Sequence, residues 1–346
     1  MDENPTDPNP ANADETRVAA GLSDAEGNRV SIEELKELMS IAPDNTIGQM
    51  ANMTTIGVGG IGTVFSAHEP VLNREIAIKI LRPAYRDRLD FVASFIREAR
   101  ITAQIDHPNV IPVHRLGVFD DAGAYFTMKR VVGVTLSHIL RELHSGNAEW
   151  QRRYSRNRLL EIFISVCNGV AFAHSKGIIH RDLKPSNIMI GDYGEVFIVD
   201  WGLALYREEN DSSHHARKIE LGELPEQLQT QSAGDDSTTK VSGTPAFMAP
   251  EQVSGRDDIL TEQTDVYALG AILYSILTWE QSPYSSGISM PQLMEQVARQ
   301  KFLRPRRRAP RRKIPYELEA ICLKAMAGKK TKRYSSVRAL LNDVRN

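Results

Sequence analysis

Cysteine is scarce in this sequence, and it has no long hydrophobic run. Only Cys167 and Cys322 occur among the 346 residues. Both lie in apolar stretches with helical periodicity, so we interpret them as core residues of a reduced, cytosolic protein. No apolar run approaches the ~18 residues that a membrane-spanning helix needs. The polar, acidic N-terminus is the opposite of a secretory signal. We therefore expect a cytoplasmic protein without a membrane span.

A strong net charge is also missing. Lys and Arg number 42 and Asp and Glu number 44, which leaves a formal net charge of −2. No overall field marks the chain as a protein that binds nucleic acid or membranes, so neither is an expected partner. Hydrophobic residues make up 41% of the sequence, enough for a substantial core. The length suggests two domains or one large two-lobed domain.

The charges that are present are distributed unevenly. Residues 1–50 carry eleven acidic and three basic residues, together with several Pro, Asn and Gly. Such a composition cannot bury enough apolar surface to order itself, so we expect a mostly flexible segment. One stretch differs, because Ser31 and Glu34 form a capping box among apolar residues at helical spacing, and Pro43 ends the pattern. We expect a short helix near residues 31–42.

The run 299–313 is charged in the opposite sense, with nine bases and no acid. One interpretation is a docking patch for an acidic substrate, for nucleic acid or for the acidic N-terminal segment. The other interpretation is a solvated loop between two helices. The sequence alone leaves both open.

The order of the periodic patterns indicates two unequal parts. Strand-like runs cover residues 54–67, 74–81, 110–118 and 124–131, and one helical pattern, 91–105, interrupts them. From residue 136 onward helical patterns dominate, including 158–177 and the almost wholly apolar 264–278. We expect a small sheet domain joined to a larger helical domain, with a cleft at the junction.

The first strand-like run contains Gly57, Gly59 and Gly62 in a G-x-G-x-x-G pattern. In dinucleotide-binding folds these glycines end a strand and open a helix, whereas in protein kinases they form a hairpin over ATP. Here Thr-Val-Phe follows Gly62, which favours a strand, and the next strand-like run contains Lys79. The pattern favours a phosphate-binding hairpin, and a plain glycine-rich hairpin is the remaining alternative.

Three further motifs lie in the second half of the chain. HRDLKPSN occupies residues 180–187, DWG residues 200–202 and GTPAFMAPE residues 243–251. Together with the glycine loop and the IAIK run at 76–79, they occur in the order and at the distances typical of protein kinases. Over about residues 54–345 the chain resembles a bacterial-type (Hanks-type) serine/threonine protein kinase.

The resemblance implies an α+β, bilobal protein-kinase fold. A small antiparallel-sheet N-lobe with one helix is expected beside a larger, mainly helical C-lobe. The expected divisions are the flexible segment at 1–50, the N-lobe and hinge at 51–131, and the C-lobe at 132–346.

The resemblance also implies which residues take part in phosphoryl transfer. Asp182 is expected to orient the substrate hydroxyl and accept its proton, and Lys184 to offset charge on the transferring phosphate. Lys79 is expected to bind the α- and β-phosphates and to pair with Glu98. Oxygen ligands for Mg²⁺ are expected from Asn187 and Asp200.

A larger set of residues is expected to contact ATP. Its members come from the glycine loop, the strand around the lysine and the hinge: Ile56, Gly57, Gly59, Gly60, Gly62, Val64, Ala77, Lys79, Met128, Lys129 and Val131. Met128 aligns with the gatekeeper at the rear of the adenine pocket, and the backbone of the hinge, 129–131, is expected to read the adenine edge.

The implied function is ATP-dependent transfer of the γ-phosphate to Ser and Thr hydroxyls of protein substrates. Arg181, before the catalytic aspartate, implies that a phosphate orders the long activation segment 200–251, which predicts autophosphorylation and self-association for that reaction in trans. The candidate sites are Ser237, Thr238, Thr239 and Ser242.

Two other function classes are alternatives. A catalytically silent scaffold usually lacks the strand lysine, the catalytic aspartate or the metal-binding aspartate, and Lys79, Asp182 and Asp200 are all present. A nucleic-acid binder would act through the run 299–313 and would tolerate loss of Asp182.

Several residues near the motifs are expected to have structural roles. His180 is expected to pack in a hydrophobic spine, and Asp265 to accept hydrogen bonds from the backbone of the catalytic loop. A buried ion pair is expected between Glu251 and Arg333. Trp201 takes the place of the phenylalanine usual in the D-F-G motif, and as a large aromatic residue it preserves the packing role.

Overall fold

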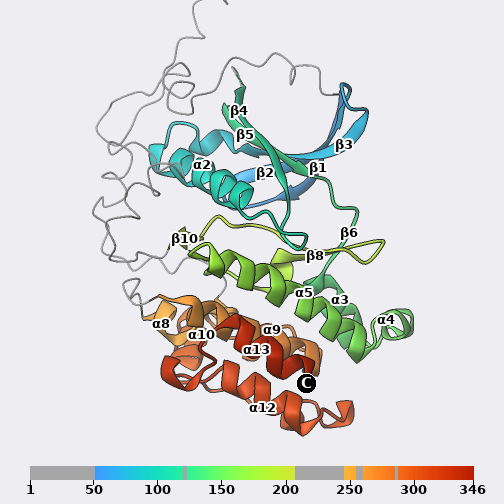
Figure 1. Ribbon diagram of the computed structural model, residues 1–346, viewed down its shortest axis with the longest axis vertical. Coiled ribbons are helices and arrows are strands. Elements are labelled where there is room, and N and C mark those ends of the chain that lie inside the picture. Colours follow the sequence, from blue (N-terminus) through green and yellow to red (C-terminus); the bar gives the residue numbers. More distant parts are fainter. Residues whose placement is uncertain (1–50, 120–122, 207–244, 255–259, 285–286) are drawn as a thin grey trace, which may run out of the picture.

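The structure is a computed structural model that describes residues 51–119, 123–206, 245–254, 260–284 and 287–346. Figure 1 shows two parts, a sheet with one long helix and a larger helical part. The segment 1–50 that was expected to be flexible, the helix expected near 31–42 and the four candidate phosphorylation sites lie outside the described residues. Within the described ranges, no helix is both long and apolar enough to cross a membrane.

The smaller part contains an antiparallel sheet in the order β1-β2-β3-β5-β4. Its strands are β1 (Ala51–Val58), β2 (Gly62–Glu69), β3 (Arg74–Leu81), β4 (Val113–Phe119) and β5 (Gly123–Lys129). A short 3-10 turn, η2 (Pro83–Tyr85), leads from β3 into α2 (Leu89–Gln104), which packs on one face of the sheet.

Both faces of β3 are covered, which explains why its sequence is apolar almost throughout. Leu81 packs with α2 in one cluster, whereas Ile76 and Ile78 belong to a second cluster with Tyr125 on the opposite face. Because successive side chains of a strand alternate between faces, Lys79 lies on the same face as Leu81. The lysine therefore points to the side of the sheet that carries α2.

The strand expected at 110–118 begins later than the sequence pattern suggested. Val110 forms only an isolated bridge with Ile198, and β4 starts at Val113. Pro112 has no N–H to donate to a ladder. Its carbonyl instead accepts a hydrogen bond from the Lys129 N–H at 3.1 Å. The apolar run before the proline thus connects the sheet to the helical part.

The larger part is mainly helical and also contains short strand pairs. Its helices are α3 (Leu136–His144), α4 (Ala148–Arg153), α5 (Arg156–Ser175), α8 (Pro250–Val253), α9 (Glu262–Thr278), α10 (Met290–Ala298), α11 (Pro305–Arg308), α12 (Tyr316–Ala325) and α13 (Val337–Arg345). Short 3-10 turns are η3 (Pro185–Asn187), η5 (Pro245–Phe247), η7 (Pro310–Arg312) and η8 (Lys330–Lys332). The strands β6 (Gly133–Thr135), β8 (Ile188–Gly191) and β9 (Val196–Ile198) form one small sheet, and β7 (Ile178–Ile179) pairs with β10 (Leu205–Tyr206).

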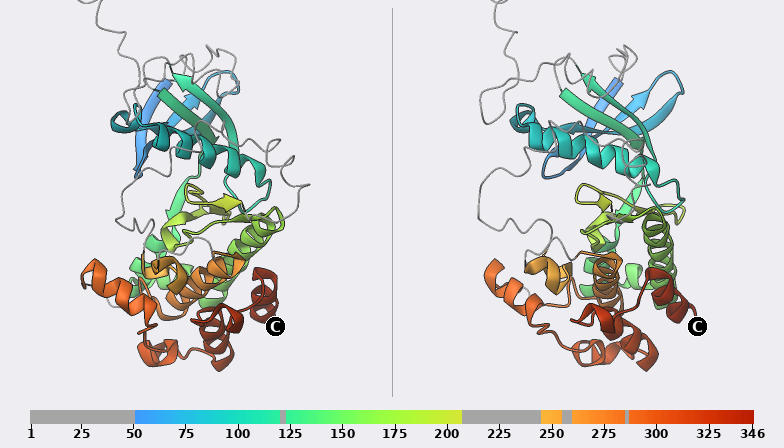
Figure 2. Two further views of the ribbon diagram at one scale, coloured as in Figure 1. Left: turned by 90° about the vertical axis from the view of Figure 1, so that its left-hand side faces the viewer. Right: turned by 60° about the vertical axis from the view of Figure 1, so that its left-hand side comes forward.

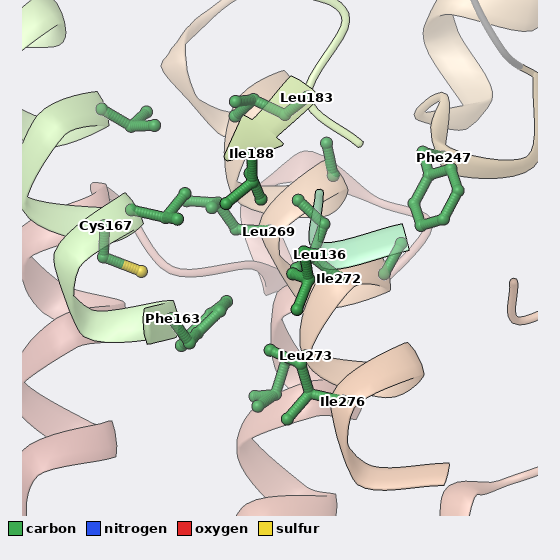
Figure 3. Packing of buried hydrophobic residues seen from close by; sticks show 14 of the residues in the cluster. Leu136, Phe163, Cys167, Leu183, Ile188, Phe247, Leu269, Ile272, Leu273 and Ile276 are labelled. Carbon is green, nitrogen blue, oxygen red and sulfur yellow. The ribbon is translucent and has the colours of Figure 1, made fainter. Parts of the chain in front are cut away.

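Two helices predicted from periodicity form the centre of this part. The Ser155 side chain caps the start of α5, and Gly177, at φ +75°, follows its end. Every residue of α9 from Thr264 to Thr278 is buried, as its apolar sequence predicted. Figure 3 shows Leu269, Ile272, Leu273 and Ile276 of α9 packed among neighbours that include Phe163 and Cys167 of α5.

Both cysteines are buried and free, as the sequence predicted: Cys167 lies in α5 and Cys322 in α12. The predicted α+β class is also confirmed, with a small antiparallel sheet and one long helix beside a mainly helical part, as the two views of Figure 2 also show. The expected boundary after residue 131 falls between β5 and β6.

Candidate active site

The register of the sheet brings together the residues around Lys79. Lys79 of β3 lies opposite Val64 of β2 and Phe126 of β5, so the three side chains share one face. On that face α2 supplies Glu98, whose Oε1 lies 2.5 Å from the Lys79 Nζ. Lys79 is only 9% exposed and Glu98 only 4%. The predicted ion pair is confirmed, and it fixes the lysine against α2.

The charge of Lys79 is supported by two carboxylates. Burial by itself lowers the pKa of Lys79, but the negative charges of Glu98 and Asp200 outweigh that effect and hold the pKa above its ordinary value. The ammonium group is therefore charged at neutral pH. The influence of Asp200 also shows that the helical part brings a carboxylate close to the lysine of the sheet.

Glycine at position 202 permits this close approach. A Cβ built on Gly202 would lie 3.3 Å from both the Asp200 Oδ1 and the Glu98 Oε2. These contacts are tighter than ordinary van der Waals distances, so a side chain would push the two carboxylates apart. Glycine is therefore favoured after Asp200 and Trp201, because a larger side chain there would crowd the two carboxylates.

The catalytic-loop residues form a second group of contacts. Lys184 Nζ lies 2.6 Å from the Asp182 Oδ2. The Asn187 side-chain amide donates to the Asp182 carbonyl at 2.9 Å and to its carboxylate at 3.3 Å. Because Asn187 uses its NH₂ group in these bonds, the amide oxygen remains as the acceptor. The sequence motif thus brings Asp182, Lys184 and Asn187 together.

Asp200 follows Val199, whose backbone N–H donates to the Asn187 carbonyl at 2.9 Å and so links Asp200 to this loop. Asp200 has a left-handed φ of 65° and an exposed side chain. Among the described residues no group of three or more His, Cys, Asp or Glu side chains could hold a metal ion. Asp200 and Asn187 supply hard oxygen donors, which suits a Mg²⁺ ion that takes its other ligands from phosphates and water.

The backbone of the catalytic loop is strained and firmly held. Arg181 has φ 68°, a conformation rarely adopted by a long side chain. Its N–H donates to the Asp265 Oδ1 at 2.9 Å, and its carbonyl accepts from the Gln252 Nε2 at 2.8 Å. The His180 N–H donates to the Asp265 Oδ2 at 2.8 Å. The predicted role of Asp265 is confirmed, and strain of this kind persists only where several bonds over-determine it.

His174, which the sequence reasoning missed, supports Asp265 from the other side. Its Nε2 lies 2.7 Å from the Asp265 Oδ2, and both side chains are buried. Burial alone raises the pKa of Asp265, but the hydrogen bond and charge of His174, together with His180, hold that pKa below its ordinary value. No sequence signal identified His174, because the residue lies 91 positions before Asp265 in the chain.

His180 has the packing role expected of it. It is 1% exposed, and its ring lies 4.5 Å from the ring of Trp201, centroid to centroid. Its Nδ1 accepts a hydrogen bond from the Asp182 N–H at 3.3 Å. Burial lowers the pKa of His180 despite three nearby aspartates, so the ring is neutral at pH 7.

The glycine loop is a hairpin between β1 and β2, as the sequence favoured. The Gly59 N–H donates to the Gly62 O at 2.8 Å, and Gly57 lies opposite Val64. A Cβ on Gly62 would lie 3.0 Å from the Lys79 Cε, and one on Gly59 would lie 3.2 Å from the Gly62 O. A Cβ on Gly60 would meet nothing within 4 Å. Close packing on the lysine therefore requires glycine at position 62.

Of the other residues expected to contact ATP, Ala77 and Met128 share the face of the sheet that carries Lys79, and the rest lie in β1, at the end of β5 or after it. Ala77 pairs with Met128 across β3 and β5. Ile56, in β1, is 50% exposed. Lys129 ends β5 with its Nζ 4.8 Å from the centroid of the Phe197 ring. Val131, partly buried, lies between β5 and β6.

The predicted pair of Glu251 and Arg333 is confirmed. Two guanidinium nitrogens of Arg333 donate to the two carboxylate oxygens of Glu251, each at 2.8 Å. Arg333 also donates to the backbone carbonyls of Ala327, Gln263 and Gly328. The pair ties α8 to the segment before α13.

Comparisons with known proteins agree with this geometry. The family model described as "Protein kinase domain" matches residues 50–344. The chain is 38% identical to the serine/threonine-protein kinase PknD of Protochlamydia amoebophila over 84% of this chain and 29% of that protein. It is 36% identical to PknD of Chlamydia muridarum over 82% of this chain and 30% of that protein. The chain thus spans about 30% of the length of these curated relatives.

Proposed function

Because this chain belongs to the protein kinase family, we propose that it transfers the γ-phosphate of ATP to Ser and Thr hydroxyls of protein substrates. The observation that carries the proposal is the meeting of a charged lysine from the sheet with a carboxylate, Asp200, from the helical part. Lys79 is paired with Glu98 and influenced by Asp200, and Asp182 lies in the loop that Asp265 holds. The names of the relatives support the choice of Ser and Thr as acceptors.

The proposed role of each residue follows from its charge and its contacts. The backbone of the glycine loop, at Gly57, Gly59, Gly60 and Gly62, covers the phosphates, and Lys79 binds the α- and β-phosphates. Glu98 keeps the lysine in position through their 2.5 Å contact. These groups bind and orient ATP, which removes much of the entropic part of the barrier.

Asp182 is the proposed acceptor of the proton from the substrate hydroxyl. As the oxygen of Ser or Thr forms a bond to the γ-phosphorus, the bond from that phosphorus to the β-phosphate oxygen breaks, and ADP leaves. Lys184, 2.6 Å from Asp182 in this structure, offsets negative charge on the phosphoryl group. Its contact with Asp182 also holds the carboxylate in position to accept the proton.

Mg²⁺ is the proposed metal, and Asn187 and Asp200 are the residues that would hold it. When bound, it neutralises the phosphate charge that would otherwise repel Asp182. The adenine is expected to contact Ile56, Val64, Ala77 and Met128, with backbone groups between Lys129 and Val131 on its edge. The exposed apolar surface of Ile56 supports this assignment.

The experiment is incubation with γ-labelled ATP and Mg²⁺, a generic protein substrate and phosphoamino-acid analysis. The proposal expects label on Ser and Thr for the wild type and loss of transfer for Lys79→Met with the fold intact. Folded wild type that binds ATP and transfers nothing would favour a catalytically silent scaffold instead. Mapping the labelled sites also tests autophosphorylation at the predicted positions, Ser237, Thr238, Thr239 and Ser242, and the concentration dependence of the rate tests whether it occurs in trans.

A further inference from the structure

The basic run 299–313 includes α11 and η7. Its basic side chains form two groups. One group has partners: Arg299 and Lys301 lie 3.2 and 4.0 Å from Glu295, and Arg308 lies 3.0 Å from Glu280. The Arg312 guanidinium lies 3.0 Å from the centroid of the Trp279 ring. The other group, here called the basic surface, is exposed and has no carboxylate partner among the described residues: Arg304, Arg306, Arg307, Arg311 and Lys313.

The backbone beneath the basic surface is held in place. Proline begins both α11 and η7 and fixes the chain direction there. The Arg306 N–H donates to the Oε1 of buried Glu319 at 2.8 Å. Arg156 of α5 donates to the carbonyls of Arg312 and Lys313 at 2.7 and 3.1 Å. The run is therefore a built surface and not merely a solvated loop.

Concentrated positive charge of this kind is unfavourable without a counter-charge. Guanidinium groups bind carboxylates with two parallel hydrogen bonds, so arginine is suited to acidic polypeptides. Two apolar side chains lie beside the charges in the sequence and are exposed: Leu303 at 53% and Tyr316 at 67%. Apolar contacts at the edge favour a polypeptide over a bare anion.

We propose that the basic surface docks the acidic segment 1–50 of the same chain. That segment carries eleven acidic and three basic residues, a net charge of −8, and is the most acidic stretch of the sequence. Fifty residues can span up to about 165 Å when extended, so reach does not limit the contact. Covalent linkage gives the segment an effective concentration of about the millimolar level, which allows weak ion pairs to add up. The proposal does not depend on the proposed transferase activity.

The test uses the full chain and zero-length carbodiimide coupling of amines to carboxylates, followed by peptide mapping. We expect the Lys313 amine to couple to Asp or Glu within residues 1–50, in a product that remains monomeric. Raising the salt from about 0.1 to about 1 M shortens the Debye length from about 10 to about 3 Å, and coupling is expected to fall about tenfold.

Matched variants locate the contact. The triple variant Arg306→Glu, Arg307→Glu and Arg311→Glu is expected to abolish coupling of Lys313 to the segment. A control with the same change of charge at three other exposed bases retains it: Lys329→Glu, Lys332→Glu and Arg338→Glu. Circular dichroism of both variants establishes that they fold.

Three results would overturn the proposal. One is the absence of coupling between Lys313 and residues 1–50 at low salt. A second is equal loss of coupling in both triple variants, since that would reflect overall charge. A third is a coupled dimer, which would assign the occupant to a second copy.

Discussion

At the scale of single residues, the position of Lys79 depends on one buried partner. Glu98 holds its Nζ at 2.5 Å, and the pair is enclosed by α2 and the sheet. Removing the negative charge of Glu98 leaves the lysine free to shift toward Asp200, the other carboxylate that raises its pKa. A shift of this kind moves the proposed phosphate-binding group without removing it.

Glu98→Gln is therefore expected to lower kcat/KM for the proposed transfer by roughly 100-fold, because displacement by about 1 Å can cost that much. Initial rates with γ-labelled ATP measure the effect. The control is Glu161→Gln, a surface change on α5 that breaks only the pair with Arg158 and leaves the rate unchanged. Equal rates for wild type and Glu98→Gln would contradict the role of the pair.

Arg333 is the second residue whose removal has a large expected effect. Its side chain is fully buried and donates to both carboxylate oxygens of Glu251 and to three carbonyls. Arg333→Ala leaves a buried carboxylate unpaired, so the free energy of unfolding is expected to fall by about 3–5 kcal/mol. Urea denaturation measures it, with exposed Lys332→Ala as the control. A decrease in the free energy of unfolding below about 1 kcal/mol would show that the pair contributes no more than a surface salt bridge.

At the scale of elements, the contact between α9 and α12 depends on a glycine. A Cβ on Gly270 of α9 would lie 2.8 Å from the Ala325 Cβ and the Met326 Cγ, at the end of α12. The two helices approach because that Cβ is missing. Side chains larger than hydrogen at this position must separate them.

Gly270→Val is accordingly expected to reduce the free energy of unfolding by about 1–3 kcal/mol, the usual cost of overpacking. Thermal unfolding followed by circular dichroism measures it. Gly60→Ala serves as the matched control, because nothing lies within 4 Å of its added Cβ. If Gly270→Val melted at the wild-type temperature, the helices would have to be farther apart than described.

Elements were predictable from the sequence where local patterns determine them. Helical spacing and a glycine stop located α5, an almost wholly apolar helical pattern located α9, and a strand-like run around one lysine located β3. The start of β4 was wrong by three residues, because the hydrophobic pattern continued across Pro112 while the hydrogen-bond ladder did not. His174 and Gln252 were missed because they bind Asp265 and Arg181, 91 and 71 positions away, and no short motif contains such contacts.

At the scale of the whole molecule, a buried pair of phenols links the pH of the solution to unfolding. The hydroxyls of Tyr267 and Tyr284 lie 2.5 Å apart. Burial raises the pKa of Tyr267 to about 12. Above about pH 10 the unfolded chain releases this proton and the folded chain retains it, so the free energy of unfolding falls as the pH rises from about 10 to about 12.

The tyrosinate absorbance at about pH 11 is expected to be lower in the folded protein than in urea, since tyrosine ordinarily ionises near pH 10. Tyr267→Phe is expected to reduce this difference, and Tyr193→Phe, which removes an exposed hydroxyl, is the control. Identical absorbance in folded and unfolded wild type would show that water reaches the buried pair.

The central proposal also belongs to the whole molecule: we propose that the sheet binds the phosphates and that the helical part supplies the carboxylate that accepts the proton. Asp182→Asn separates these functions most directly, because it preserves shape and removes the acceptor. The measurement compares ATP binding and γ-phosphate transfer in wild type and variant. We expect ATP affinity to change by less than about threefold while transfer falls by about a thousandfold or more, within the 10²–10⁴ range typical of acid–base catalysis. Transfer by Asp182→Asn at the wild-type rate would contradict the account.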